Sequence, residues 1–212
     1  NLFPKPERLS YGEAAAMSLS FLTAWHMLVG RAQLKRGESV LVHAGGSGVG
    51  SCAVQIAKFI GAHVITTAGS QDKLELAKTL GADAGINYVE EDFVKEVRAL
   101  TDKRGVDVVF EHVGGEVFER SLRCLAWAGR LVTCGATTGI DAKINLRHLF
   151  FKSQSILGST MGTRREFQEL VELYAAGHFR AVIDRTLPMR DIADAHRAIE
   201  AREVFGKVVI AP

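Results

Sequence analysis

Along this chain, short runs of apolar residues alternate with longer stretches whose apolar residues recur at helical spacing. The short runs are rich in β-branched residues and nearly continuous, as in strands that are buried on both faces. About six strands are predicted in this way, at residues 39–44, 63–68, 84–88, 106–113, 129–135 and 155–160. Strands that alternate with helices predict an α/β fold with a doubly wound parallel sheet, built from two mononucleotide-binding halves.

The strongest helical pattern follows the first strand and ends at Gly61, a residue type suited to the position after a helix. Its apolar residues share one face: Val49, Cys52, Ala53, Ile56, Ala57 and Ile60. Near the C-terminus a second stripe stops at Gly177, and it consists of Phe167, Leu170, Val171 and Tyr174. Asp191 is predicted to cap a last helix, which bears Ile192, Ala195 and Ile199. The sheet is therefore followed by an appendage of helix and strand.

The first helical stretch begins with Ser10 and Glu13, which have the spacing of a capping box. The apolar run at residues 14–29 is interrupted by polar residues, namely Ser18, Ser20, Thr23 and His26. These interruptions disfavour a membrane span, and the run lacks the charged, apolar and cleavage-site order of a signal peptide. We interpret it as a buried helix pair.

A glycine-rich turn connects the first strand to the strongest helix, in the sequence Val-Leu-Val-His-Ala-Gly-Gly-Ser-Gly-Val-Gly at residues 40–50. Gly45 allows a tight turn, and Gly50 allows close packing of the helix on the strand. The helix N-terminus offers N–H groups and a positive dipole end to a pyrophosphate. This predicts a Rossmann fold whose dinucleotide site includes Gly45, Gly46, Ser47, Gly48, Val49 and Gly50.

The turn departs from the usual pattern at Ser47, where a glycine normally lets the backbone approach the phosphates, and Gly48 beside it compensates. The alternative interpretation is a tight strand-to-helix connection that binds no ligand.

The end of the second strand bears on the choice between NAD and NADP. Ala68 stands where an acidic residue would bind the ribose hydroxyls of NAD. Ser70 and Lys73 follow, and their hydroxyl and ammonium groups suit a 2′-phosphate. We therefore predict NADPH as the cofactor, in preference to NADH. Alternatively, Ser70 is an N-cap, Asp72 complements the helix dipole and Lys73 is a solvated surface charge.

Two further turns lie at the carboxyl ends of predicted strands, where ligands of open α/β sheets bind. The backbone at Val113 and at Gly135 is accordingly predicted to approach the cofactor. Glu111 and His112 are adjacent near a strand end, and we interpret both as structural, because neighbouring strand residues point to opposite faces. No catalytic residue is assigned.

Several motifs in order give the chain a resemblance to the medium-chain dehydrogenases/reductases, in their quinone oxidoreductase-like and zinc-type alcohol dehydrogenase-like branch. They are Thr23-Ala-Trp25, the glycine-rich turn, residues 82–88, Gly158-Ser159 and the closing Phe205-Gly-Lys-Val-Val-Ile210. The resemblance implies hydride transfer with a nicotinamide cofactor. It also implies that Thr23 touches the nicotinamide end, Val49 the ring or its ribose, and Tyr88 the 2′-phosphate side. Lys207 would reach the pyrophosphate, or would serve only as a strand-edge lysine.

Members of this family begin with a GroES-like catalytic domain, and nothing in the chain corresponds to it. We therefore expect a fragment, with residues 1–20 as an inter-domain connection and residues 21–160 as the nucleotide-binding domain. Residues 161–212 would pack back on the missing domain. In relatives the last sheet strand pairs across a two-fold axis, which implies a homodimer through residues 155–160 and 145–151.

The resemblance also bears on zinc, because Leu19 occupies the position of a cysteine ligand in zinc-dependent members, and leucine cannot bind zinc. Cys52, Cys124 and Cys134 are too widely spaced to predict a zinc site. The leading hypothesis is an NADPH-dependent reductase of a quinone, enone, aldehyde or ketone that uses no zinc ligand from this chain. The alternatives are a zinc-dependent alcohol dehydrogenase with its ligands in the missing domain, and a non-catalytic dinucleotide-binding redox sensor.

The amino-acid composition mainly excludes certain classes of binding partner. The 212 residues carry a formal net charge of +2, with 26 basic and 24 acidic side chains spread along the chain. This distribution predicts neither a nucleic-acid partner nor an anionic membrane surface, and leaves a small-molecule substrate as the expected partner. Three scattered cysteines favour a reducing compartment, so we expect a cytoplasmic protein.

Overall fold

The computed structural model describes residues 2–212. At its centre is a six-stranded parallel sheet with the order β3-β2-β1-β4-β5-β6. The strands are β1 (Ser39–Val42), β2 (His63–Ala68), β3 (Ala84–Asn87), β4 (Val106–Glu111), β5 (Leu125–Thr133) and β6 (Ser155–Gly158). The strand order reverses beside β1, which confirms the predicted doubly wound sheet.

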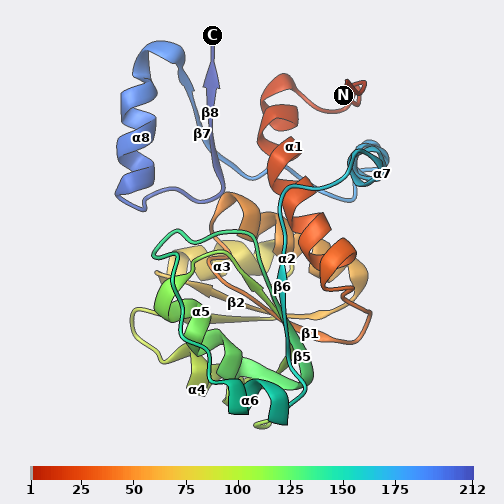
Figure 1. The fold of residues 1–212 in the computed structure, drawn as a ribbon. Coiled ribbons are helices and arrows are strands. Elements are labelled where there is room, and N and C mark those ends of the chain that lie inside the picture. The colour runs from red at the N-terminus through yellow and green to blue at the C-terminus, as the bar shows by residue number, and fades with distance from the viewer. Residues whose placement is uncertain (1) are drawn as a thin grey trace.

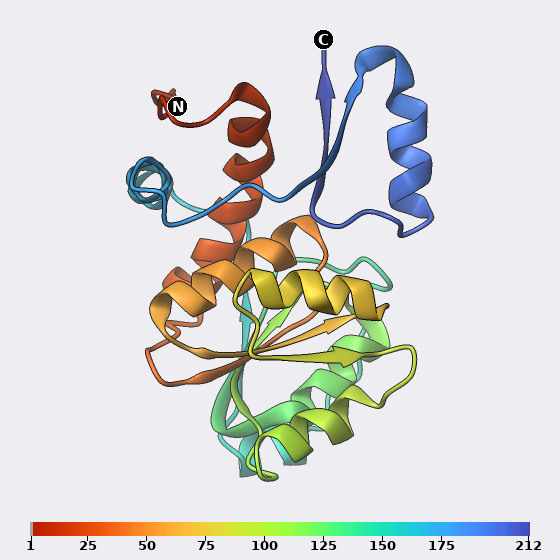
Figure 2. The same ribbon diagram turned by 180° about the vertical axis from the view of Figure 1, so that it is seen from behind.

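Helices cover both faces of the sheet (Figures 1 and 2). One face carries α1 (Tyr11–Trp25), α2 (Gly48–Ile60) and α3 (Gln71–Thr79). The other carries α4 (Phe93–Leu100), α5 (Gly115–Ser121), the short 3-10 helix η2 (Leu122–Cys124) and α6 (Leu146–Phe151). No helix of residues 2–212 combines the length and apolar character that a membrane crossing requires.

Two hydrophobic cores result, one on each face of the sheet. Along β1, Val40 and Val42 belong to the core under α1 and α2, whereas Leu41 belongs to the core under α4. Side chains alternate between the faces of a strand, so a strand buried on both sides must be apolar at every position. This explains the near-continuous apolar runs in the sequence.

The N-terminal helix begins as predicted but continues differently. The Ser10 hydroxyl accepts the Glu13 N–H at 3.2 Å and the Glu13 carboxylate accepts the Ser10 N–H at 2.7 Å, which confirms the capping box. Instead of a helix pair, α1 runs directly into a π-helical segment, η1 (His26–Arg31). The expected boundary between residues 20 and 21 falls inside α1, whose Met17 and Phe21 are buried in one core.

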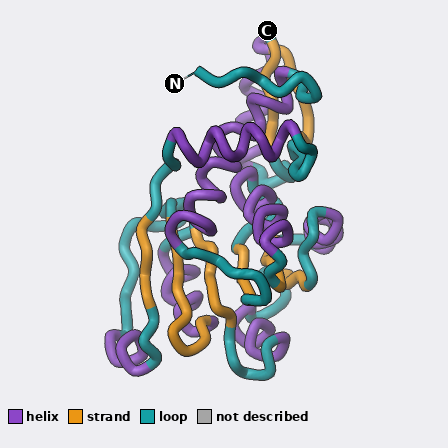
Figure 3. The backbone as a smooth tube through the Cα atoms, turned by 90° about the vertical axis from the view of Figure 1, so that its right-hand side faces the viewer, coloured by secondary structure: helices purple, strands orange, loops and turns teal. Residues whose placement is uncertain are grey.

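The C-terminal residues form two parts. Helix α7 (Arg164–Ala175) packs through Tyr174 against Phe21 of α1, at a ring distance of 5.5 Å. Beyond it, β7 (Ile183–Pro188), the 3-10 helix η3 (Met189–Asp191), α8 (Ile192–Glu200) and β8 (Lys207–Ala211) form a parallel two-stranded unit. Figures 1 and 3 show this unit standing apart from the main sheet, beside the N-terminal part of α1. The predicted appendage is confirmed, although Asp191 precedes α8 without a capping side-chain hydrogen bond.

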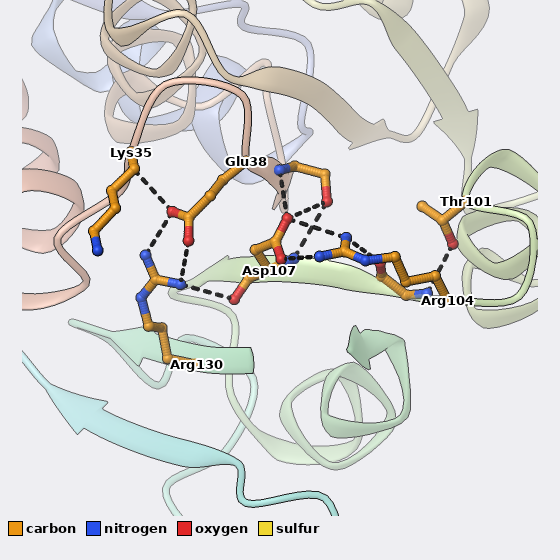
Figure 4. A network of polar contacts seen from close by, with 8 residues as sticks. Lys35, Glu38, Thr101, Arg104, Asp107 and Arg130 are labelled. Atoms are coloured by element: carbon orange, nitrogen blue, oxygen red, sulfur yellow. Dashed lines mark hydrogen bonds and ion pairs between the residues drawn. The ribbon is translucent and has the colours of Figure 1, made fainter. Parts of the chain in front are cut away.

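A network of charged groups joins the amino ends of the central strands (Figure 4). Arg130 of β5 binds both carboxylate oxygens of Glu38, at 3.0 and 2.6 Å. Asp107 of β4 accepts the Ser39 N–H at 2.8 Å and pairs with Arg104. The network therefore ties three strands together at one edge of the sheet, opposite the carboxyl edge where a ligand is expected.

Candidate dinucleotide-binding site

The glycine-rich turn between β1 and α2 ends at Ser47, the N-cap residue of α2. The Ser47 hydroxyl accepts the Gly50 N–H at 2.9 Å, so this residue caps the helix where the sequence pattern leads one to expect glycine. Within residues 2–212, the N–H groups of Gly48 and Val49 have no hydrogen-bond acceptor. Free N–H groups at the positive end of a helix dipole are suited to phosphate, so both amides are available to a diphosphate.

Two glycines of this turn leave no room for a side chain. A Cβ on Gly45 would lie 2.1 Å from Thr66 Oγ1, and a Cβ on Gly50 would lie 2.2 Å from the Ala44 carbonyl oxygen. Both distances are far below van der Waals contact. They agree with the predicted roles, in which Gly45 allows the tight turn and Gly50 the close packing of α2 on the strand.

The C-terminal segment lies against the same turn. The Gly206 N–H donates to the Gly46 carbonyl at 2.7 Å, and the Phe205 ring lies 3.0 Å from the position that a Gly46 Cβ would take. The Lys207 side chain covers Gly48, with Nζ 3.4 Å from the position of a Cβ there. The Lys207 ammonium thus lies at the helix end that bears the free amides. Lys207 also begins β8, so its second interpretation, as a strand-edge residue, fits as well.

A second group of predicted residues meets at the carboxyl end of β2. Ser70 is the N-cap residue of α3 and accepts the Lys73 N–H at 3.5 Å. The Lys73 ammonium donates to the Arg202 carbonyl at 2.5 Å. The Tyr88 hydroxyl lies 2.8 Å from the position that a Cβ on Gly69 would take. The structure therefore brings Ser70, Lys73 and Tyr88 together around this turn.

The geometry of the turn between β2 and α3 supports parts of two interpretations, the capping of α3 and the binding of a 2′-phosphate. Ser70 caps α3 and Asp72 lies in its first turn, as the structural interpretation predicts. Lys73, in contrast, is more than a solvated charge, because its ammonium reaches the C-terminal segment. The sequence analysis did not predict that Arg202 contacts Lys73. Its only signal was its position three residues before the Phe-Gly-Lys motif.

The turns after β4 and β5 meet at the carboxyl edge of the sheet. Glu111 ends β4 and is fully buried, and its carboxylate accepts the N–H groups of Val113 and Gly114, both at 2.6 Å. The Thr133 hydroxyl of β5 donates to its other oxygen at 2.9 Å. These three hydrogen bonds occupy the carboxylate with structural contacts, in agreement with the structural interpretation of Glu111.

Gly114 and Gly135 keep these two turns close to each other. Gly114 has a φ of 83°, and a Cβ on it would lie 2.5 Å from the Gly139 carbonyl oxygen. A Cβ on Gly135 would lie 2.9 Å from the His112 carbonyl oxygen. The backbone at Val113 and Gly135 is therefore gathered at the edge where the cofactor is predicted to bind.

His43 was not among the predicted residues, although it directly follows β1. Burial lowers the pKa of His43 to about 3, so the ring is neutral at physiological pH. The Ser121 hydroxyl donates to the Val117 carbonyl at 2.6 Å and therefore accepts from His43 Nε2, at 2.8 Å. The Thr67 hydroxyl, which accepts the Ala44 N–H, lies 3.2 Å from His43 Nδ1. His43 thus braces the start of the glycine-rich turn as a fixed neutral tautomer.

Thr23 lies half-buried on α1, which packs against α2, the helix that begins with Gly48 and Val49. No side-chain hydrogen bond joins Thr23 to the turn within the part of the chain that the structure describes. Its predicted contact with the nicotinamide therefore stays a prediction.

The three cysteines and Leu19 bear on whether this chain can bind a metal ion. Cys52 and Cys124 are buried and Cys134 is half-buried, and burial raises the thiol pKa of all three, to about 11 for Cys134. Leu19 is half exposed on α1. Among residues 2–212, His, Cys, Asp and Glu side chains nowhere gather in a group of three suited to a metal ion.

The known proteins to which this chain is similar are dehydrogenases and reductases. The family model described as zinc-binding dehydrogenase matches residues 48–176. The chain is 32% identical to the 2-haloacrylate reductase of a Burkholderia species, over 99% of this chain and 66% of that protein. It is 34% identical to quinone oxidoreductase 1 of Escherichia coli, over 98% of this chain and 67% of that protein. The chain thus spans about two thirds of the length of these relatives.

Solved structures agree with these matches. A crystal structure of an NAD-dependent alcohol dehydrogenase superposes with a TM-score of 0.94 at 45% identity, covering 100% of this chain and 62% of that one. The crotonyl-CoA carboxylase/reductase AntE, in complex with NADP, superposes with a TM-score of 0.89 at 27% identity, covering 98% of this chain and 58% of that one.

Proposed function

Because the chain belongs to the zinc-binding dehydrogenase family of medium-chain oxidoreductases, we propose that it binds NADPH and supplies the cofactor site of a reductase. The observation that carries this proposal is the pair of free amides at Gly48 and Val49, with the Lys207 ammonium beside them. These groups supply two N–H donors, a helix dipole and one positive charge to a diphosphate.

The rest of the cofactor would lie along the carboxyl edge of the sheet. The diphosphate would lie at the Gly48 and Val49 amides beside the Lys207 ammonium, and Val49 and Thr23 would lie toward the nicotinamide. The turns at Val113 and Gly135 would line the same end. Once bound, the nicotinamide supplies the hydride chemistry, and this chain contributes binding and orientation.

The preference for NADPH rests on the end of β2. Ala68 offers no carboxylate to ribose hydroxyls. The Ser70 and Tyr88 hydroxyls lie at this turn, and Lys73 follows in the first turn of α3, where its ammonium donates to the Arg202 carbonyl. A phosphate ester takes up such donors readily. The similar structures differ on this point, since one is named an NAD-dependent enzyme and another holds NADP.

The proposed acceptor is a quinone, enone, aldehyde or ketone. Two relatives point this way, because one is named a quinone oxidoreductase and the other a 2-haloacrylate reductase. A zinc-dependent alcohol dehydrogenase is the second candidate, favoured by the similarity to an alcohol dehydrogenase structure. Metal analysis of the complete protein distinguishes the two.

The free cysteines favour a reducing compartment, and we place the enzyme in the cytoplasm.

We also propose a homodimer through β6 and α6. Strand β6 ends the six-stranded sheet and, within residues 2–212, pairs only with β5, so one of its edges is open to a second strand. Beside it, Phe150 and Phe151 of α6 are 70% and 64% exposed, and Trp127 is 63% exposed. Large apolar side chains gathered beside an open strand edge suit contact with a second copy of this chain.

The test of cofactor binding is a titration of NADPH and NADH, followed by nicotinamide fluorescence, on the protein and two lysine variants. Lys73→Ala should weaken NADPH binding by about tenfold, as expected for one lost charge-assisted contact, and should leave NADH binding within about twofold. Lys78→Ala is the matched control, because Lys78 lies on the same helix and pairs with Glu75. Tighter binding of NADH, or no loss in Lys73→Ala, would reject the preference. Turnover of NADPH by the complete protein with quinones, enones and aldehydes tests the reductase activity, and a complete protein that binds NADPH without turnover would be a redox-sensing module.

A further inference from the structure

Residues of α4, α5 and α6 line a cavity of about 530 Å³. These helices lie on the other face of the sheet (Figure 1). The volume of the cavity is in the range of small-molecule sites. Apolar side chains form part of its wall, including Val94, Leu122 and Leu149. None of the residues that line it belongs to the glycine-rich turn or to the other predicted cofactor contacts.

Basic side chains from separate elements converge on this cavity. Arg98 comes from α4, Arg123 from η2, Lys143 from the loop before α6, and His148 from α6. None of the four takes part in an ion pair within residues 2–212. The one acidic residue of the lining is Glu119, and its carboxylate already accepts the Lys143 N–H at 2.6 Å. The cavity therefore has an excess of positive charge that the fold itself does not neutralise.

The basic groups around the cavity repel one another electrostatically. Burial lowers the pKa of His148, and the charges of Lys152, Arg123 and Arg98 lower it further. Burial also lowers the pKa of Lys152, again with a contribution from Arg98. Such mutual repulsion disfavours the arrangement in the protein alone, and an anion within the cavity would turn it into attraction. The chain as a whole has a net charge of only +2, so this concentration of charge is local.

We propose that this cavity is a second binding site, which takes a small organic phosphate. Two arginines offer planar, paired N–H groups that match phosphate oxygens, and Lys143 adds a third permanent charge. A phosphate monoester carries close to two negative charges in a single group, which suits three cations around one cavity better than a single carboxylate does. The apolar wall at Val94, Leu122 and Leu149 would receive the organic part of the ligand.

The experiment uses inorganic pyrophosphate as the probe and nuclear magnetic resonance as the readout. The reporters are the Gln154 side-chain amide and the His148 ring, which line the cavity. The backbone amides of Gly48 and Val49 report separately on the dinucleotide site. We expect saturable shifts at Gln154 and His148, with binding weakened by about tenfold or more in the double variant Arg98→Ala/Arg123→Ala. Citrate should bind more weakly than pyrophosphate.

Lys95→Ala is the matched control, because Lys95 is exposed on the same helix as Arg98 and does not line the cavity. It should leave pyrophosphate binding within about twofold. Lys143→Ala tests the same site from another element, should the double variant lose its fold. Shifts confined to Gly48 and Val49, equal weakening by Lys95→Ala, or citrate binding as tight as pyrophosphate would each overturn the proposal.

Discussion

The Glu111 carboxylate accepts the Gly114 N–H at 2.6 Å and thereby shapes the turn that follows β4. The same oxygen accepts the Val113 N–H, so one buried side chain sets the backbone of two residues at the predicted cofactor edge. No ion pair within residues 2–212 includes Glu111, so these donors compensate for the burial of its carboxylate.

Replacing Glu111 by alanine should therefore cost about 1–3 kcal/mol of unfolding free energy, because buried N–H groups lose their acceptor. Glu111→Gln keeps one carbonyl oxygen as acceptor and should cost less. Urea denaturation measures both. Equal losses in the two variants would contradict a role as acceptor. In the complete enzyme, Glu111→Ala should also raise the KM for NADPH.

Lys207→Ala should weaken NADPH and NADH by the same factor, about tenfold, because the side chain lies at the diphosphate end that both cofactors share. This distinguishes Lys207 from Lys73, whose loss should affect NADPH alone. Fluorescence titration of the two cofactors gives the comparison. A selective effect of Lys207→Ala on either cofactor would show that its ammonium acts elsewhere.

Gly50→Ala should destabilise the protein by about 1–3 kcal/mol, since the new methyl group would lie 2.2 Å from the Ala44 carbonyl oxygen. Gly12→Ala is the control in another helix. A Cβ on Gly12 would meet Val209 at an ordinary 3.6 Å, and alanine favours helix, so this variant should be neutral or slightly stabilising. Thermal and urea unfolding report the difference. A Gly50→Ala protein as stable as the parent would mean that α2 can move away from the strand.

Asp107 should make stability depend on pH under acidic conditions. Burial by itself would raise the pKa of Asp107, but hydrogen bonds from Arg104 and Ser39 outweigh it and hold the pKa below its ordinary 3.8. A carboxyl group whose pKa is lower in the folded state contributes stability that is complete above the unfolded pKa and is lost as the pH falls through the folded pKa.

Asp107→Asn should therefore lower the unfolding free energy by about 1–2 kcal/mol at pH 7 and by less at low pH, where the parent has also lost this contribution. Urea unfolding at a series of pH values tests this. Asp141→Asn is the control, at an exposed residue without an ion pair in the described chain, and should have little effect. A loss that is independent of pH would contradict the electrostatic explanation.

Phe150→Asp should convert the proposed homodimer to a monomer, because it places a charge among apolar side chains at the contact. Sedimentation velocity on the complete protein gives the answer. The control is Leu76→Asp, which alters a partly exposed apolar residue of α3 on the opposite face of the sheet. A monomeric parent protein, or a dimer unaffected by Phe150→Asp, would count against the β6 and α6 contact.

Much of the fold was determined locally and could be predicted from the sequence. The six strands, the helix that ends at Gly61 and the capping box at Ser10 follow from spacing over a few residues, which sets backbone geometry directly. One predicted strand boundary differs from the structure. Strand β5 begins at Leu125, four residues before the predicted start at Gly129, because its pairing with β4 shifts register there. The N-terminal helix pair was wrong, since polar residues interrupt an apolar run without breaking the helix.

The sequence by itself determined the chemistry at the glycine-rich turn, because a strand, a turn and a helix that follow one another expose their N–H groups wherever they pack. Only the tertiary structure decided what surrounds that turn. The Gly206 N–H reaches the Gly46 carbonyl, and the Lys73 ammonium reaches the Arg202 carbonyl, across most of the length of the chain. Such contacts depend on how separate elements pack together, and no periodicity within a single segment encodes them.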